Sequence, residues 1–210
     1  MSGRQIASSA VIHPGVVLPE DIVVEDFCVL GAPAGTAAPT IFGNGAHLRS
    51  HTVVYAGNTI GRGFRTGNKA NIREHNQIGD DVSIGTLSVV EHHVTIGSRV
   101  RIHTQAFTPE FTVIEDDAWL GPNVVLTNAL YPAAADTKDK LAGARLCRGC
   151  KIGANVTVLP GITIGAGALI GAGSLVTKDV PPDALAYGHP SQVHGTVSSL
   201  APYRDPRRQD

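Results

Sequence analysis

The chain has 210 residues, with 17 Lys or Arg against 18 Asp or Glu. This length predicts a single domain over residues 1–210, and the balanced charge argues against nucleic acid or an anionic membrane as a partner. The sequence has neither an apolar run of signal length near its start nor a membrane-spanning run of roughly 20 apolar residues, so we expect a cytoplasmic protein. Cys28, Cys147 and Cys150 fit free thiols in a reducing compartment and do not complete a zinc site, so no metal is expected.

A six-residue period runs through most of the chain. From Leu48 to Leu126, twelve of the fourteen positions spaced by six are Ile, Leu or Val. An α-helix would repeat its apolar positions every 3.6 residues and an amphipathic strand every two. A period of six with one apolar position therefore predicts a short strand and a turn, repeated in an all-β architecture.

In chain order, the pattern first appears between Ile12 and Leu30, which predicts coils over about residues 10–30. The segment 31–45 is rich in Ala, Pro and Gly and is expected to leave the coils as a loop. Coils are expected again over about 46–180, interrupted by a second loop at 131–147, because the period returns at Ile152 two residues out of phase. Residues 181–210 are expected to form a short C-terminal tail.

Stacked repeats of this kind bury a continuous apolar column and predict a parallel β-helix, whose handedness does not follow from the spacing. Over roughly residues 48–193, the repeat of aliphatic residue, Gly and small residue resembles the hexapeptide-repeat acyltransferase superfamily. The resemblance implies a left-handed parallel β-helix with about 18 residues per coil and a homotrimer with active sites between subunits. It also implies acetyl-CoA as cosubstrate.

Positions 18 apart in such a coil lie above one another. One column then contains Glu74, His92, Glu110 and Asn128, and the column beside it contains His93. An imidazole with a pKa near neutrality can accept the proton that an ammonium group must lose before it attacks a thioester. The alternative is a solvated ladder of polar side chains at a corner.

A narrower resemblance covers residues 114–132, which are similar to N-acetyltransferases acting on dTDP- or UDP-linked 3-amino sugars. The matching residues are Thr127, Asn128, Tyr131 and Pro132, whereas Ala129 and Ala133 replace an expected Asp and Arg. The resemblance implies that Asn128 and Glu110 bind the sugar beside its amine and that His92 and His103 lie near the acyl carrier. We therefore expect acetyl transfer to the amine of a nucleotide-linked amino sugar.

These arguments give three sets of candidate site residues. The catalytic candidates are His92, Glu110 and His103. The substrate-binding candidates are Asn128, Glu74, His93, Tyr131 and Arg73. Residues 146–182 and 188–190 resemble the common C-terminal half of the superfamily, and the implied cofactor-binding residues there are Gly153, Ala154, Gly171, Ala172, Lys178 and Arg148.

Three other functions remain open from the sequence. An O-acetyltransferase acting on a sugar or small hydroxyl acceptor would use His92 as a base equally well. A γ-type carbonic anhydrase would share this fold, and its metal site resembles a His-x4-His pattern within the coils. In this sequence that spacing occurs only at His189 and His194, which lie beyond the predicted coils. A non-catalytic β-helix scaffold would not require the polar column.

Overall fold

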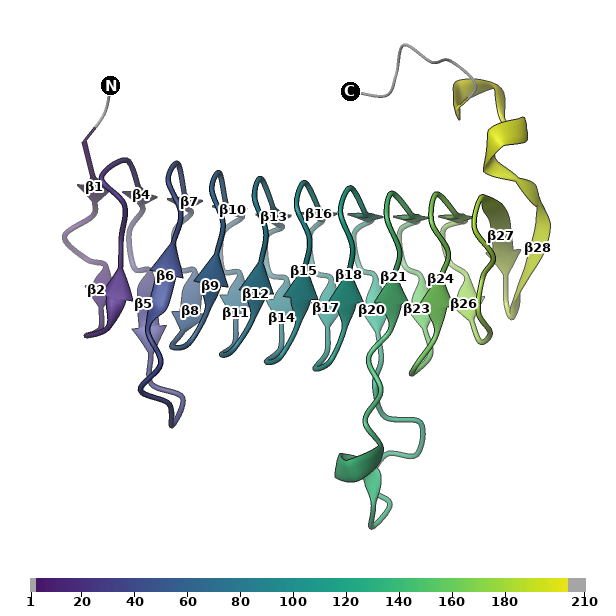
Figure 1. Ribbon diagram of the computed structural model, residues 1–210, viewed down its shortest axis with the longest axis horizontal. Helices are drawn as coiled ribbons and strands as arrows, with labels where there is room; N and C mark the ends of the chain where they lie inside the picture. The colour runs from purple at the N-terminus through teal and green to yellow at the C-terminus, as the bar shows by residue number, and fades with distance from the viewer. Residues whose placement is uncertain (1–2, 204–210) are drawn as a thin grey trace.

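The computed structural model describes residues 3–203, which form one continuous rod of stacked coils (Figure 1). Each coil contributes one short strand to each of three parallel sheets. This part of the chain has no α-helix, and none of its short 3-10 helices is long and apolar enough to cross a membrane. The elements confirm the prediction of an all-β solenoid built from short strands and turns.

The first sheet, sheet A, contains β1 (Gln5–Ile6), β4 (Val23–Val24), β7 (His47–Leu48), β10 (Arg65–Thr66), β13 (Ser83–Ile84), β16 (Arg101–Ile102), β19 (Trp119–Leu120), β22 (Lys151–Ile152), β25 (Leu169–Ile170), β27 (Ala184–Gly188) and β28 (Ser191–Thr196). Sheet B contains β2 (Val11–Ile12), β5 (Val29–Ala32), β8 (Val53–Tyr55), β11 (Asn71–Ile72), β14 (Val89–Val90), β17 (Phe107–Thr108), β20 (Val125–Leu126), β23 (Thr157–Val158) and β26 (Leu175–Val176). Sheet C contains β3 (Val16–Val17), β6 (Thr40–Phe42), β9 (Thr59–Ile60), β12 (Gln77–Ile78), β15 (Thr95–Ile96), β18 (Val113–Ile114), β21 (Arg145–Leu146) and β24 (Thr163–Ile164).

The register between coils is 18 residues through most of the rod. Arg65 lies opposite Ser83, and Ser83 lies opposite Arg101 in the next coil. This spacing confirms the predicted coil length of a parallel β-helix. It also fixes which side chains share a corner, because residues 18 apart occupy equivalent places in successive coils.

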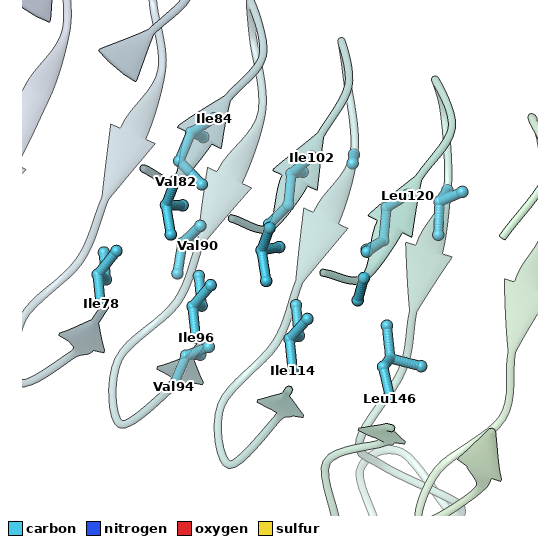
Figure 2. Close-up of a cluster of buried hydrophobic side chains, with 14 of the residues drawn as sticks. Ile78, Val82, Ile84, Val90, Val94, Ile96, Ile102, Ile114, Leu120 and Leu146 are labelled. Atoms are coloured by element: carbon cyan, nitrogen blue, oxygen red, sulfur yellow. The ribbon is translucent and has the colours of Figure 1, made fainter. Parts of the chain in front are cut away.

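The core is a narrow column of aliphatic side chains that point inward from all three sheets (Figure 2). Ile84, Ile102 and Leu120 from sheet A and Ile96 and Ile114 from sheet C are each at most 2% exposed. Every position of the six-residue series from Leu48 to Leu126 is buried, including the two threonines that interrupt it. Packing of one such side chain per strand stabilises each coil against the next.

Three corners join the sheets, and we name each by the strands that it connects. Corner AB follows a sheet A strand, corner BC follows a sheet B strand, and corner CA follows a sheet C strand. Many corners contain a non-glycine residue in the left-handed region, as at His93 (φ 57°) in corner BC and Arg99 (φ 59°) in corner CA. Such corners turn the backbone sharply and leave their side chains on the outside of the rod.

Both excursions leave the rod at corner BC, and both are shorter than predicted (Figure 1). The first was predicted over 31–45, but Gly31 and Ala32 belong to β5 and the chain rejoins sheet C at Thr40. The second was predicted over 131–147, but β21 already pairs with β18 and β24. The reason is that Leu146 falls on the same six-residue series as Ile152 and is fully buried, so it belongs to the coil.

The ends of the chain also contain more structure than predicted. Strand β1 pairs with β4, so the coils begin near residue 5 instead of residue 10. Residues 184–196, expected to lie in a tail, form the antiparallel pair β27–β28, and β27 pairs in parallel with β25. The 3-10 helices η1 (Thr137–Lys140), η2 (Val197–Ser199) and η3 (Ala201–Tyr203) complete the described elements. The hairpin extends sheet A past the last coil.

Thr108 provides a test of core packing, because its buried hydroxyl has no hydrogen-bond partner among residues 3–203. Replacing Thr108 by Val keeps the shape and removes the unpaired group, so Thr108→Val should raise the free energy of unfolding by about 1 kcal/mol. Urea denaturation would measure this change.

Thr66→Val is the matched control, since Thr66 occupies the equivalent inward position but its hydroxyl contacts the Arg49 amide at 2.9 Å and the Thr52 hydroxyl at 2.8 Å. This control should lower the free energy of unfolding by about 1–2 kcal/mol. Equal effects of the two substitutions would contradict the assignment of Thr108 as an unsatisfied site.

Candidate active site

Four polar residues of the predicted column lie on corner BC in successive coils. The Asn128 side-chain amide donates to Glu110 Oε2 at 2.5 Å, and Glu110 Oε1 lies 3.2 Å from His92 Nε2. The carboxylate of Glu110 therefore joins the carboxamide above it to the imidazole below it. The structure brings together three of the predicted residues, His92, Glu110 and Asn128, as the 18-residue spacing requires.

The contact extends to the next column through His93, whose Nδ1 lies 2.7 Å from His92 Nδ1. A hydrogen bond between two such nitrogens needs one N–H donor and one lone pair. One assignment satisfies every contact with both rings neutral: His93 Nδ1–H donates to His92 Nδ1, and His92 Nε2–H donates to Glu110. Burial lowers the pKa of His93, and the neighbouring His92 and His75 lower it further, which favours the neutral ring in this assignment.

Glu74 lies in the same column but is paired with its neighbour Arg73. The Arg73 guanidinium contacts both oxygens of Glu74, at 2.8 and 3.0 Å, and also lies 5.0 Å from the Tyr55 ring centroid. Burial would raise the pKa of Glu74, but the hydrogen bonds and charge of Arg73 outweigh it, so the pKa is lowered. Both residues border the cluster as one ion pair, with Arg73 also 3.6 Å from Glu91.

A ledge of rings runs beside this polar column. The ring centroids of His75 and His93 are 5.2 Å apart, and those of His93 and Phe111 are 6.0 Å apart. Gly57 ends the ledge, because a Cβ there would come within 2.9 Å of His75 Nδ1. His75 and Phe111 were not among the predicted site residues, although the same 18-residue spacing places both next to the polar column.

His103 lies elsewhere on the molecule. It is in corner AB, where its ring contacts Trp119 with centroids 4.6 Å apart. His103 is eleven residues from His92, which is not a multiple of 18, so the two histidines lie on different corners of the rod. Within one chain, His103 does not join the cluster of His92, Glu110 and Asn128.

The six cofactor candidates are divided among the three corners. Gly153, Ala154, Gly171 and Ala172 stack in corner AB, where a Cβ on Gly153 would lie 2.5 Å from the Ala172 amide. Lys178 is exposed on corner BC, two coils beyond Asn128 in the same column. Arg148 is on corner CA, with its guanidinium 3.6 Å from Asp116. One chain alone does not gather these residues into a single site.

Tyr131 lies in the second excursion, and the residue is 71% exposed. The excursion starts directly after Asn128, since the Ala142 amide donates to the Asn128 carbonyl at 2.9 Å where the chain returns to the coil. Its backbone is also tied by the Thr137 hydroxyl, which donates to the Tyr131 carbonyl at 2.7 Å. The excursion therefore rises from the corner that carries the polar column.

The cysteines lie apart from this cluster. Cys28, Cys147 and Cys150 are free thiols, and burial raises the pKa of Cys150 to about 12. A thiol with such a pKa is a poor nucleophile near neutral pH. Among residues 3–203, no three His, Cys, Asp or Glu side chains are grouped so that they could hold a metal ion.

Comparison with known proteins shows where this architecture recurs. Residues 77–108 and 143–178 match the family described as bacterial transferase hexapeptide (six repeats). The UDP-N-acetylglucosamine acyltransferase of Francisella novicida has a similar structure, with a TM-score of 0.81 over 97% of this chain and 75% of that one, at 20% identity. Residues 77–108 and 143–178 thus carry the repeat of this family, and the chain shares the fold of this acyltransferase.

Two curated proteins are similar in sequence over most of the chain. The bifunctional protein GlmU of Geobacillus sp. (strain WCH70) is 30% identical over 190 residues, which cover 90% of this chain and 39% of GlmU. GlmU of Listeria monocytogenes serotype 4b (strain F2365) is 28% identical over 188 residues, or 90% of this chain and 38% of GlmU. The chain thus spans less than two fifths of the length of these curated relatives.

The lowered pKa of His93 predicts a pH-dependent stability. As the pH falls past the ordinary histidine value of 6.5, the unfolded chain binds a proton that folded His93 resists, so folding should lose stability with acidification. His93→Asn removes the titrating ring while keeping a residue that tolerates the left-handed backbone. Urea midpoints measured from pH 8 to pH 5 should fall less steeply in this variant.

His51→Asn is the control, because His51 (φ 64°) has the same backbone conformation but contacts Phe27 outside the cluster. This control should keep the wild-type dependence on pH. The interpretation of His93 would be wrong if His93→Asn and wild type lost stability in parallel.

Proposed function

We propose that this chain is an acetyl-CoA-dependent N-acetyltransferase that acts on the amine of a dTDP- or UDP-linked amino sugar. The observation that carries the proposal is the linked set Asn128, Glu110 and His92 on the outside of a hexapeptide-repeat β-helix. If these residues had only a structural role, the fold would not require a carboxylate and an imidazole to be in contact on an exposed corner. The structural similarity to a UDP-N-acetylglucosamine acyltransferase adds support for acyl transfer to a nucleotide sugar.

In the proposed reaction, the Glu110 carboxylate holds the ammonium group of the sugar, and Asn128 orients that carboxylate. Loss of a proton to the Glu110–His92 pair leaves a neutral amine, which attacks the thioester carbonyl of acetyl-CoA. The new C–N bond forms, the C–S bond breaks, and the thiolate of CoA leaves and takes up a proton. A backbone N–H of a glycine-rich corner is suited to stabilise the tetrahedral oxyanion.

The donor would lie against corner AB, where Gly153, Ala154, Gly171 and Ala172 carry at most a methyl group. Small residues there permit close approach of a pantetheine arm and hydrogen bonds to backbone groups. In this proposal Lys178 and Arg148 reach toward phosphates, and Tyr131 on the excursion covers the sugar. His103, on the same corner as the glycines, would contact the acyl carrier instead of the amine.

These corners come together if the protein is a homotrimer that packs through sheet B. The outward side chains of sheet B form an apolar row: Val11, Val29, Val53, Val89, Phe107, Val125 and Leu175, interrupted by Asn71 and Thr157. The corresponding row of sheet A contains Arg65, Arg101 and Lys151. Sheet B lies between corners AB and BC, so a head-to-tail ring of three copies would set corner BC of one copy beside corner AB of the next.

A second candidate is O-acetylation of a sugar or small hydroxyl acceptor. The contact between His92 and Glu110 favours it, because a carboxylate-oriented imidazole is the usual activator of a hydroxyl nucleophile. Whether amine or hydroxyl acceptors are turned over in an acetyl-transfer assay distinguishes N-acetylation from O-acetylation. For either reaction we propose a cytoplasmic location, on the basis of the three free thiols.

The function can be tested by following CoA thiol release with a panel of acceptors. We expect turnover with dTDP- or UDP-linked 3-amino or 4-amino sugars, and slower or no turnover with simple hydroxyl acceptors. Glu110→Gln and Asn128→Ala should each lower kcat/KM at least about 10-fold, since the first removes the charge that holds the reacting amine and the second removes the amide that orients the carboxylate. Glu20→Gln is the control, because Glu20 lies exposed near the N-terminal end, where it pairs with Arg4.

Turnover of hydroxyl acceptors alone would replace the amino-sugar proposal with the second candidate. Wild-type activity in both Glu110→Gln and Asn128→Ala would show that these two residues are not part of the active site.

The trimer can be tested with Phe107→Asp, which places a charge in the apolar row of sheet B. We expect monomers by analytical ultracentrifugation and loss of acetyl transfer, because an unpaired charge in a packed interface is costly. Thr95→Asp, at the corresponding outward position of sheet C, should leave the assembly intact. A trimer in Phe107→Asp would show that sheet B is not the contact face.

A further inference from the structure

Charge is unevenly distributed around the rod. Between His47 and Ser174, the strands of sheet A and the AB corners contain no Asp or Glu, whereas they contain Arg49, Arg65, Lys69, Arg101 and Lys151. Over the same coils, the acidic residues lie on corners BC and CA. A chain with a net charge of −1 therefore carries, over these coils, a strip that has basic side chains and no carboxylate.

Two arginines of this strip differ from most others in the structure. Six arginines have a carboxylate oxygen within 4.0 Å, namely Arg4, Arg62, Arg73, Arg99, Arg145 and Arg148. Within residues 3–203, neither Arg65 nor Arg101 has such a partner, and both are exposed. Their positive charge is not balanced by the protein around them.

A groove of about 200 Å³ is lined by both of these arginines. Its floor is Ser83 and Gly85, which are small, while Arg65 in the coil before and Arg101 in the coil after form its walls. The two arginines are two coils apart, or about 10 Å along the rod. His103 lines the end of the groove on corner AB.

We propose that this groove binds a diphosphate group, with one phosphate on each guanidinium and the Ser83 hydroxyl between them. Guanidinium groups bind phosphate oxygens through paired, charge-assisted hydrogen bonds, and the two arginines approach the groove from opposite sides. The inference rests on the proposed function only for the origin of the diphosphate, which is present both in a nucleotide-linked sugar and in CoA. It assigns His103 to the binding of this ligand and separates it from the amine-binding cluster.

The test is calorimetric titration of the intact protein with inorganic pyrophosphate and with inorganic phosphate at low salt. We expect wild type to bind pyrophosphate more tightly than phosphate. The double variant Arg65→Gln, Arg101→Gln should weaken pyrophosphate binding at least about 10-fold, because both charge-assisted contacts are lost. Arg62→Gln is the matched control, since it makes the same change in charge at a guanidinium already paired with Asp80 on corner CA, and its binding should equal that of wild type.

Titrations with UDP and with CoA identify the source of the diphosphate. A loss of affinity for UDP alone in the double variant assigns the groove to the acceptor, and a loss for CoA alone assigns it to the donor. The proposal is overturned if wild type binds no pyrophosphate, shows no preference for it over phosphate, or binds it no better than the double variant. None of these titrations requires acetyl transfer, so a chain without that activity can still bind diphosphate here, and an active chain can fail to do so.

Discussion

The parallel pairing of each coil with the next, 18 residues along the chain, determines the rest of the structure. Arg65, Ser83 and Arg101 follow one another in this register on sheet A, and Asn71 and Val89 do so on sheet B. An added residue inside a strand would turn buried side chains outward and break the pairing with both neighbouring coils. The chain therefore places its two excursions at a corner, where additional residues leave the strands undisturbed (Figure 1).

The core of this fold was predictable because one position in six carries most of the information. Each of the fourteen positions from Leu48 to Leu126 is buried, as the period requires. Handedness came from resemblance, since spacing alone gives no sense of rotation. The excursion limits were less accurate, because Ala, Pro and Gly occur in corners as well as in loops, and Gly31 could not be assigned to β5 by composition. The hairpin β27–β28 was missed because antiparallel strands have no six-residue period.

In the candidate site, some contacts are determined by the register between coils and others by the rotamers of the side chains. The 18-residue spacing was sufficient to place His92, Glu110 and Asn128 in one column, and it also separates His103 from them. It could not predict that Glu74 turns toward Arg73 or that His92 meets His93, because those contacts join adjacent residues and depend on rotamers. Register thus gives the neighbours of a corner residue in other coils, and the structure is needed for its neighbours in the same coil.

The separation of charge between corners gives the proposed trimer a physical rationale. Corner BC carries Glu74, Glu91 and Glu110, whereas corner AB carries Arg49, Lys69 and His103. In a head-to-tail ring through the apolar row of sheet B, these corners of adjacent copies meet with opposite charge, which favours one orientation of the copies over the other. The same arrangement would bring the groove between Arg65 and Arg101 to the side of the rod that faces the amine-binding column of the next copy. In a site assembled in this way, no single corner has to bind the diphosphate, the amine and the acyl donor together. Each corner would bind one of these groups, and for that a few side chains are sufficient.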